Sequence, residues 1–157
     1  MDKSIFKLLV AVSLSLHAEY IRDSDKQVVL DASSGLVWQD NTLDSTLHWT
    51  TAIKTCEALE LGGYSDWRLP NYSELSQLAD RSKSSTAVSS MFQNTPSGDY
   101  WSSSTYAPTS DTAWHVYFSY GSSNTYDKSY SGYIRCVIED SRYDTGKYNR
   151  QNRYDRE

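Results

Sequence analysis

The chain contains only two cysteines, Cys56 and Cys136, which stand about 80 residues apart. A disulfide between them would close half of the chain into a loop, and in the chain-entropy model such a loop stabilises the fold by about 4.5 kcal/mol. In an exported protein, two cysteines and no others are expected to form a disulfide. The alternative is that both are buried free thiols. The cellular location of the chain therefore decides whether this constraint operates.

The first eighteen residues have the pattern of a secretory signal peptide. Lys3 and Lys7 come first, the apolar run 8–16 follows, and Ala18 supplies a small residue at the expected cleavage point. An apolar run of this length is too short to cross a bilayer. We therefore predict a signal peptide at 1–18 and a chain that is secreted or periplasmic and not inserted in a membrane. The alternative is a buried or interfacial N-terminal helix.

The sequence is acidic, with a formal net charge of −5. Residues 1–18 contribute Asp2, Lys3 and Lys7, a net +1, so the remaining chain carries about −6. Because phosphate binding needs clustered Lys and Arg, this balance argues against nucleic acid as a partner.

Residues 27–39, QVVLDASSGLVWQ, predict a β-hairpin. Val28 to Leu30 form one short strand, residues 31–35 supply turn chemistry, and Leu36 to Trp38 form the returning strand.

Residues 47–61 have the spacing of an amphipathic helix, and Gly62 and Gly63 stand where its C-terminus is expected. The apolar positions of this helix recur at steps of three or four: Trp49, Ile53, Cys56 and Leu59 or Glu60.

A second helix is predicted from Asn71 to near Asp80. Asn71 with Glu74 three residues later is a capping-box pattern, and Pro70 disfavours helical backbone in the residue before it. The apolar face would consist of Tyr72, Leu75, Leu78 and Ala79. Residues 81–98 then read as a long loop with one apolar island, Met91-Phe92, and long loops inside domains tend to be functional.

From residue 99 the pattern changes to strands, predicted at 99–104, 112–121, 124–130 and 132–139. In the second strand, Trp114, Val116 and Phe118 alternate with His115, Tyr117 and Ser119, which predicts one buried face and one wet face. In the last strand, Ile134, Cys136 and Ile138 share a face.

Strands, two helices, a loop and then antiparallel strands indicate an α+β domain, which we place at residues 19–140. Residues 141–157 contain no aliphatic side chain and many charges, so they predict a disordered polar tail.

Five ordered stretches carry a resemblance to a known family: SGLVWQDN, WTTAIKTCEALELGGYSDWRLPNYSEL, YWSSST, AWHVYF and YIRCV. Together they resemble the C-terminal domain of the Legionella collagen-like adhesin, over residues 28 to about 139. The resemblance implies a C-type lectin-like fold, with two helices on a twisted antiparallel sheet. In that fold a cysteine of the first helix pairs with one of the last strand, which here are Cys56 and Cys136.

The segment Asp66-Trp67-Arg68 lies between the two predicted helices. We interpret it as a structural joint, in which Trp67 enters the core and Arg68 pairs with Asp66 or Glu74. A ligand contact and a catalytic role are the alternatives. Trp101 and Trp114 are also assigned to the structure.

Enzyme signals are sparse. The sequence contains no HExxH, CxxC, GxSxG or P-loop motif, and outside residues 1–18 it has two histidines, His48 and His115. Asp99, Asp111 and Asp127 are scattered, and the sugar-site motifs of calcium-dependent lectins are absent. We predict no catalytic residues, no metal and no cofactor.

The composition of the strand region predicts a binding surface. Tyr with Ser, Gly and Asn is the composition of antibody paratopes, because Tyr supplies contact area at low entropic cost. A solvated sheet surface with good β propensity is the alternative. The residues assigned to ligand binding are Tyr106, His115, Tyr117, Tyr120, Asn124, Tyr126, Lys128 and Tyr130.

The sequence therefore predicts a non-enzymatic, adhesin-like binding module for a glycan or an extracellular protein. The alternative is a structural envelope protein, or a subunit of an extracellular assembly, whose Tyr-rich face packs on a partner. The adhesin that the chain resembles is associated with sulfated glycosaminoglycans, but the acidic charge of this chain does not favour such ligands.

Overall fold

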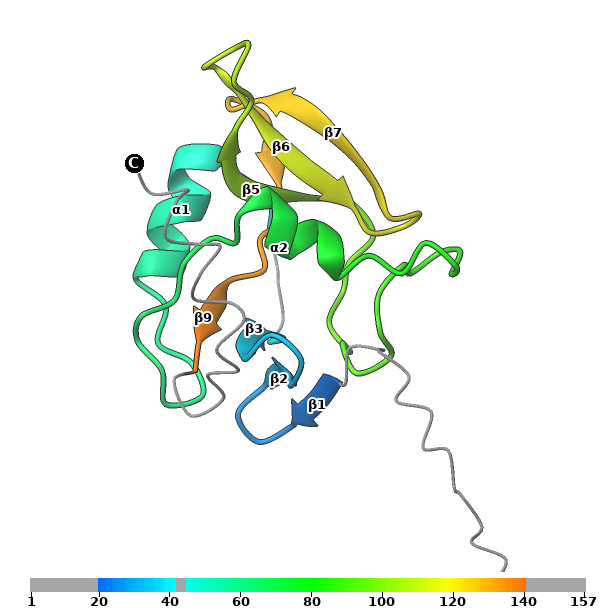
Figure 1. Ribbon diagram of the computed structural model, residues 1–157. Coiled ribbons are helices and arrows are strands. Elements are labelled where there is room, and N and C mark those ends of the chain that lie inside the picture. The colour runs from blue at the N-terminus through cyan, green and yellow to red at the C-terminus, as the bar shows by residue number, and fades with distance from the viewer. Residues whose placement is uncertain (1–19, 42–44, 141–157) are drawn as a thin grey trace, which may run out of the picture.

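The computed structural model describes residues 20–41 and 45–140 and shows an α+β fold with two short helices and three antiparallel sheets (Figure 1). The signal peptide predicted at 1–18 and the tail predicted at 141–157 lie outside the described residues. The elements are β1 (Tyr20–Asp23), β2 (Val28–Asp31), β3 (Leu36–Gln39), β4 (Leu47–His48), α1 (Trp49–Glu57), α2 (Tyr72–Gln77), β5 (Asp99–Thr105), β6 (Thr112–Tyr117), β7 (Ser122–Asp127), β8 (Ser131–Gly132) and β9 (Val137–Glu139).

The predicted hairpin at 27–39 is confirmed as β2 and β3, which pair antiparallel from Val28↔Gln39 to Asp31↔Leu36. The Asp31 carboxylate accepts hydrogen bonds from the Ser33 backbone and hydroxyl, and this local bonding stabilises the turn. Two further strands complete the sheet in the order β1-β2-β3-β9.

Both predicted helices are present, and both are shorter than the sequence suggested. α1 begins at Trp49 because Leu47 and His48 pair with β8, and it ends at Glu57. Gly62 and Gly63 lie beyond its end, in a turn where their φ angles are +63° and +84°.

The capping box predicted at the start of α2 is confirmed. The Asn71 side chain accepts a hydrogen bond from the Glu74 amide, and the Glu74 carboxylate accepts one from the Asn71 amide, both at 2.8 Å. The helix ends at Gln77 and not near Asp80, because the Asp80 amide instead donates to the carbonyl of Ala87 in the following loop.

The four strands predicted after residue 99 do not form one sheet, and this expectation is corrected. β5, β6 and β7 form a three-stranded sheet, β8 pairs with β4, and β9 joins the N-terminal sheet beside β3. The predicted last strand, 132–139, is thus divided between two sheets, because residues 133–136 cross from one to the other.

Two apolar clusters fill the interior. One lies beside α1 and contains Trp67, Trp101 and the cysteines, and the other lies beside α2 and contains Trp38, Tyr100 and Phe118. The disulfide between Cys56 and Cys136 is present, with Cα atoms 5.5 Å apart, and it ties α1 to the residue before β9. The long loop 81–98 contributes Val88 and Phe92 to the second cluster, whereas residues 81–86 are exposed.

The segment between the helices lies where the two clusters meet β9. Trp67 is 2% exposed, and the Arg68 backbone exchanges two hydrogen bonds with Val137. Of the two partners predicted for Arg68, the structure shows Glu74, which accepts two bonds of 2.7 and 2.8 Å from its guanidinium, while Asp66 is exposed. These contacts are those of a joint that orients α2.

Neither helix in the described ranges has the length and apolar character that crossing a bilayer requires.

Candidate functional site

The candidate site lies on one face of the three-stranded sheet. The register pairs Trp101 with His115 and His115 with Asn124, and it pairs Ala113 with Tyr126. Because cross-strand partners point to the same side of a sheet, these side chains share a face, and Trp114 and Val116 lie on the opposite face. Within the apolar cluster beside α1, Trp101 and Ala113 cover the inner part of the first face.

The prediction that His115 and Ser119 lie on a wet face is wrong. His115 is 3% exposed and Ser119 is 5% exposed, whereas Trp114, expected to be buried, is only partly so. For His115 the alternation fails because both faces of β6 are covered at its centre, and Ser119 lies beyond the end of β6, where its hydroxyl contacts that of Ser97. α2 packs against one face, and Trp101 and Tyr126 enclose His115 on the other.

The rings around His115 form a continuous series from the core to the solvent, which we call the aromatic column: Trp101, His115, Tyr126 and Tyr130. Trp101 meets His115 edge-on at 6.3 Å between centroids, His115 stacks on Tyr126 at 4.1 Å, and Tyr126 lies 5.7 Å from Tyr130. Exposure rises outward, to 40% at Tyr126 and 63% at Tyr130. The outermost ring is therefore supported from beneath by packed neighbours.

His115 is also fixed by a carboxylate. Its Nε2 lies 3.0 Å from Asp99 Oδ1, while its buried Nδ1 has no hydrogen-bond partner among the residues described. Desolvation lowers the pKa of the imidazole, and the charge of Asp99 opposes this shift in part. We assign the neutral tautomer in which Nε2–H donates to Asp99, because a proton on Nδ1 would be buried without an acceptor.

A second pair of rings continues the face toward the β6–β7 turn. Tyr117 and Tyr120 lie 5.8 Å apart between centroids, and Tyr120 is 65% exposed. Asn124 is exposed beside His115 on the neighbouring strand. We call this set the tyrosine face: the half-buried Tyr117 and the exposed Tyr120, Asn124, Tyr126 and Tyr130.

Besides the buried His115, two other residues assigned to ligand binding from the sequence do not join the tyrosine face. Tyr106 packs edge-on against Trp114, which in turn stacks on Tyr72 of α2, on the opposite side of the sheet. The Lys128 ammonium donates to Thr105 Oγ1 and to a backbone carbonyl, and it lies 4.0 Å from the centroid of a Trp49 ring. This ammonium is thus fixed in position by neutral intramolecular partners.

Sequence reasoning missed a buried charge cluster centred on Asp40. Asp40 and Arg135 are each 1% exposed, and Arg135 Nη1 lies 2.9 Å from the Asp40 carboxylate. Arg22 also pairs with Asp40, whose carboxylate further accepts the backbone amides of Gln93 and Asn94. The available signal was a charged residue inside the apolar stretch YIRCV. The cluster fastens the end of the 81–98 loop to β3, so we assign it to the structure.

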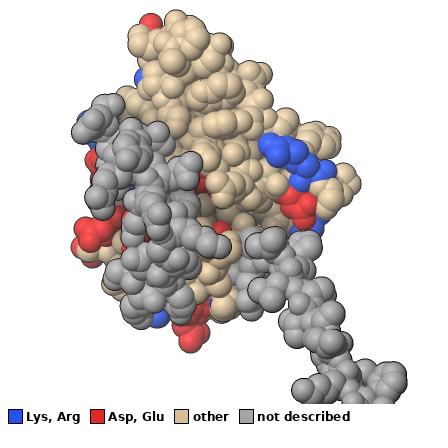
Figure 2. Space-filling view, viewed as in Figure 1, with Lys and Arg blue, Asp and Glu red and all other residues tan. Residues whose placement is uncertain are grey.

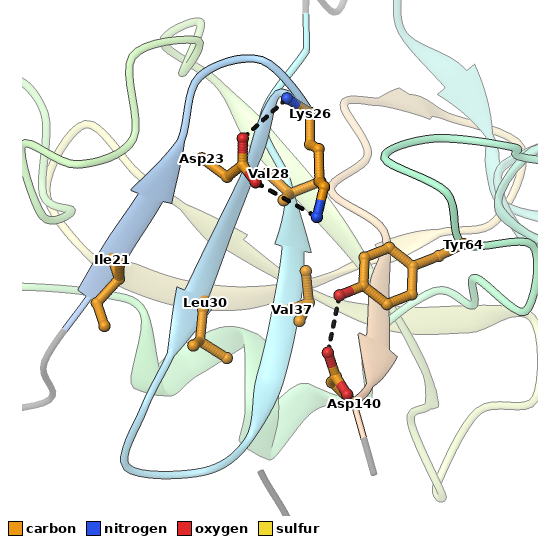
Figure 3. A pocket seen from close by; sticks show the side chains of 8 residues that line it. All are labelled: Ile21, Asp23, Lys26, Val28, Leu30, Val37, Tyr64 and Asp140. Carbon is orange, nitrogen blue, oxygen red and sulfur yellow. Dashed lines mark hydrogen bonds and ion pairs between the residues drawn. The ribbon is translucent and has the colours of Figure 1, made fainter. Parts of the chain in front are cut away.

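A cavity of about 190 Å³ lies on the N-terminal sheet, away from the tyrosine face (Figure 3). Tyr64 donates a hydrogen bond of 2.8 Å to Asp140 at one side, and Lys26 pairs with Asp23 at the other. Ligand pockets usually measure 300–1,000 Å³, so this cavity is small for an organic ligand. Its lining consists of Ile21, Asp23, Lys26, Val28, Leu30, Val37, Tyr64 and Asp140.

The acidic residues weighed as calcium ligands do not converge. Asp99 holds His115, and Asp127 accepts hydrogen bonds within its own turn, which lower the pKa of its carboxyl. Within residues 20–41 and 45–140, no three His, Cys, Asp or Glu side chains are grouped closely enough to hold a metal ion.

The fold and this surface define a disulfide-closed α+β module that displays tyrosines on one sheet face. The Lcl C-terminal domain family matches residues 27–138, and the chain belongs to that family. This confirms the resemblance to the C-terminal domain of the Legionella collagen-like adhesin that the sequence predicted. No curated protein matches the chain.

Proposed function

We propose that the protein is a secreted or periplasmic, non-enzymatic binding module of adhesin-like character, which recognises a glycan or an extracellular protein through the tyrosine face. Membership of the Lcl C-terminal domain family is consistent with this role. The family resemblance extends the proposal to a C-type lectin-like fold, supported by a cysteine of α1 that is bonded to the residue before β9.

The observation that carries the proposal is the exposure of rings on a rigid support. Tyr120 and Tyr130 are 65% and 63% exposed, and exposed tyrosines among small polar residues are the composition that binding surfaces such as antibody paratopes use. Tyr130 is backed by Tyr126, which stacks on the buried His115, and Tyr120 packs against Tyr117. A preorganised surface loses less entropy on binding, and this strengthens its affinity.

Binding of labelled protein to intact cells, of both bacterial and animal origin, tests this function. The double variant Tyr126→Ala/Tyr130→Ala should lose binding, while Tyr106→Ala, on the opposite side of the sheet, should keep it. Equal binding by the wild type and the double variant would remove the tyrosine face as the binding site.

The exposed tyrosines would also suit a structural envelope protein in which the face is covered by a partner subunit. In that case the purified chain should form a stable oligomer that the same double variant breaks. Size-exclusion chromatography with light scattering separates the two functions. For a binding module, the wild type and the double variant should have the same molar mass, whereas for a structural subunit the double variant should have the lower one.

A further inference from the structure

We propose that the Tyr126–Tyr130 end of the tyrosine face binds a neutral saccharide chain and rejects sulfated and uronic-acid polymers. The inference rests on the proposed function, since it names the ligand class of the same surface. The surface around Tyr126 and Tyr130 also differs from one that binds a polyanion, because polyanion binding needs clustered cationic side chains.

The first argument is the shape of the surface. Tyr130 ends the aromatic column, with a ring that is 63% exposed and backed by Tyr126. A pyranose presents C–H groups on its flat face, and such groups pack favourably on the negative face of an aromatic ring. Since Tyr126 stacks at 4.1 Å on a histidine held by Asp99, the platform is fixed before a ligand arrives.

The second argument is charge. The Asp99 side chain, at the base of the column, is 31% exposed, and Asp127 is exposed at the end of β7. Both carboxylates therefore repel an anionic polymer. The nearest ammonium in sequence, that of Lys128, keeps its charge, but its bonds to Thr105 and a backbone carbonyl and its place over the Trp49 ring fix it in position. An uncharged ligand meets no such electrostatic penalty.

The charged groups near the rest of the sheet are few. Figure 2, in the orientation of Figure 1 with α2 in front, shows a mostly uncharged surface over β5–β7 on that side, with charged atoms at the tip and more of them lower on the molecule. Arg81 approaches the β6–β7 turn, where its Nε donates to the carbonyl of Gly121. This cation is beside Tyr120, at the other end of the tyrosine face, which confines the inference to Tyr126 and Tyr130.

The third argument is the hydrogen-bonding groups beside the rings. Asn124 stands two residues before Tyr126 on the same face and is exposed, and Ser129 and Ser131 flank Tyr130. Amide and hydroxyl groups both donate and accept, so they match sugar hydroxyls without needing a charge on the ligand. Aromatic faces with small polar neighbours therefore fit a neutral sugar better than a sulfated one.

The test uses the purified full chain with its disulfide formed, and two sets of probes. The first is an array of neutral oligosaccharides, including glucans, galactans and mannans, and the second is matched pairs of polymers such as dextran and dextran sulfate. We expect at least one neutral saccharide to bind, and sulfation of that saccharide to weaken binding by about tenfold or more.

Matched variants assign the binding to the platform. Tyr130→Ala should weaken binding by about five- to tenfold, because it removes one stacking ring. Tyr130→Phe should stay within about twofold, because it keeps the ring, and Tyr106→Ala should have no effect. The inference is overturned if no neutral saccharide binds, if the sulfated form binds as tightly, or if Tyr106→Ala weakens binding as much as Tyr130→Ala.

The failure of this inference can be told apart from the failure of the proposed function. If cell binding is lost in Tyr126→Ala/Tyr130→Ala but survives periodate oxidation of the cell-surface sugars, the face binds a protein and only the saccharide inference is wrong. If cell binding does not depend on these tyrosines at all, both proposals are wrong.

Discussion

The substitution Asp40→Ala should be among the most destabilising single changes in this protein. It leaves Arg135, which is 1% exposed, as a buried guanidinium without its carboxylate, and it takes the same partner from Arg22. Breaking a buried ion pair from one side costs about 3–5 kcal/mol. The amides of Gln93 and Asn94 also lose their acceptor, but neither residue is buried, so water can replace much of these two bonds.

A loss of about 4–5 kcal/mol is therefore expected, against a total stability of about 5–15 kcal/mol for a domain of this kind. Urea unfolding followed by tryptophan fluorescence measures it. The matched control is Asp23→Ala, which removes a carboxylate from an exposed pair with Lys26 and should cost less than about 1 kcal/mol.

The reasoning would be refuted if Asp40→Ala and Asp23→Ala shifted the urea midpoint equally. That result would mean that water reaches the two guanidinium groups once the carboxylate is gone. A double variant, Asp40→Leu/Arg135→Met, offers a further check. It should recover part of the loss, because it removes the uncompensated charge of Arg135.

Three further predictions concern stability. Trp67→Ala should cost about 3–5 kcal/mol, because the side chain is 2% exposed in the cluster beside α1; an unchanged melting temperature in differential scanning calorimetry would contradict its role in the joint. Replacing Cys56 and Cys136 together by Ala should cost up to about 4.5 kcal/mol in urea unfolding, and a loss near zero would show that the disulfide does not constrain the unfolded chain. The pKa of His115 is lowered in the folded state, so the unfolded state binds the proton more tightly. The contribution of the neutral His115 to stability is therefore complete above about pH 6.5, and it is lost as the pH falls below that value. Urea midpoints at pH 7.5 and 5.5 should therefore differ more in the wild type than in His115→Gln, and identical pH dependence in the two proteins would refute the assignment of the buried neutral imidazole.

Local signals in the sequence predicted local structure well. The hairpin around Gly35 and the capping box of Asn71 and Glu74 depend on residues that are neighbours along the chain, and both appear as predicted. The end of α1 was less well predicted, because Leu59 continues the helical spacing beyond Glu57 although the chain has already begun to turn. Apolar periodicity does not mark where a helix stops.

Features that depend on contacts between distant residues were predicted less well. The alternation of His115 with Val116 could not reveal that Tyr126 covers one face of β6 while α2 covers the other. The pairing of Asp40 with Arg135 joins residues 95 positions apart. The charged residue in the apolar stretch YIRCV signals a buried charge, but nothing local in the sequence identifies its partner. Composition selected the tyrosines of the proposed site, but it could not separate the exposed Tyr126 from Tyr106, which packs on the other side of the sheet.

The central claim is that recognition takes place on the exposed end of the aromatic column. The most direct test is an NMR titration of protein labelled in its tyrosine rings, with the best-binding ligand from the cell or saccharide assays. The account predicts that the signals of Tyr126 and Tyr130 shift together with saturation while that of Tyr106 stays unchanged. A titration in which Tyr106 shifts and the two column tyrosines do not would contradict it.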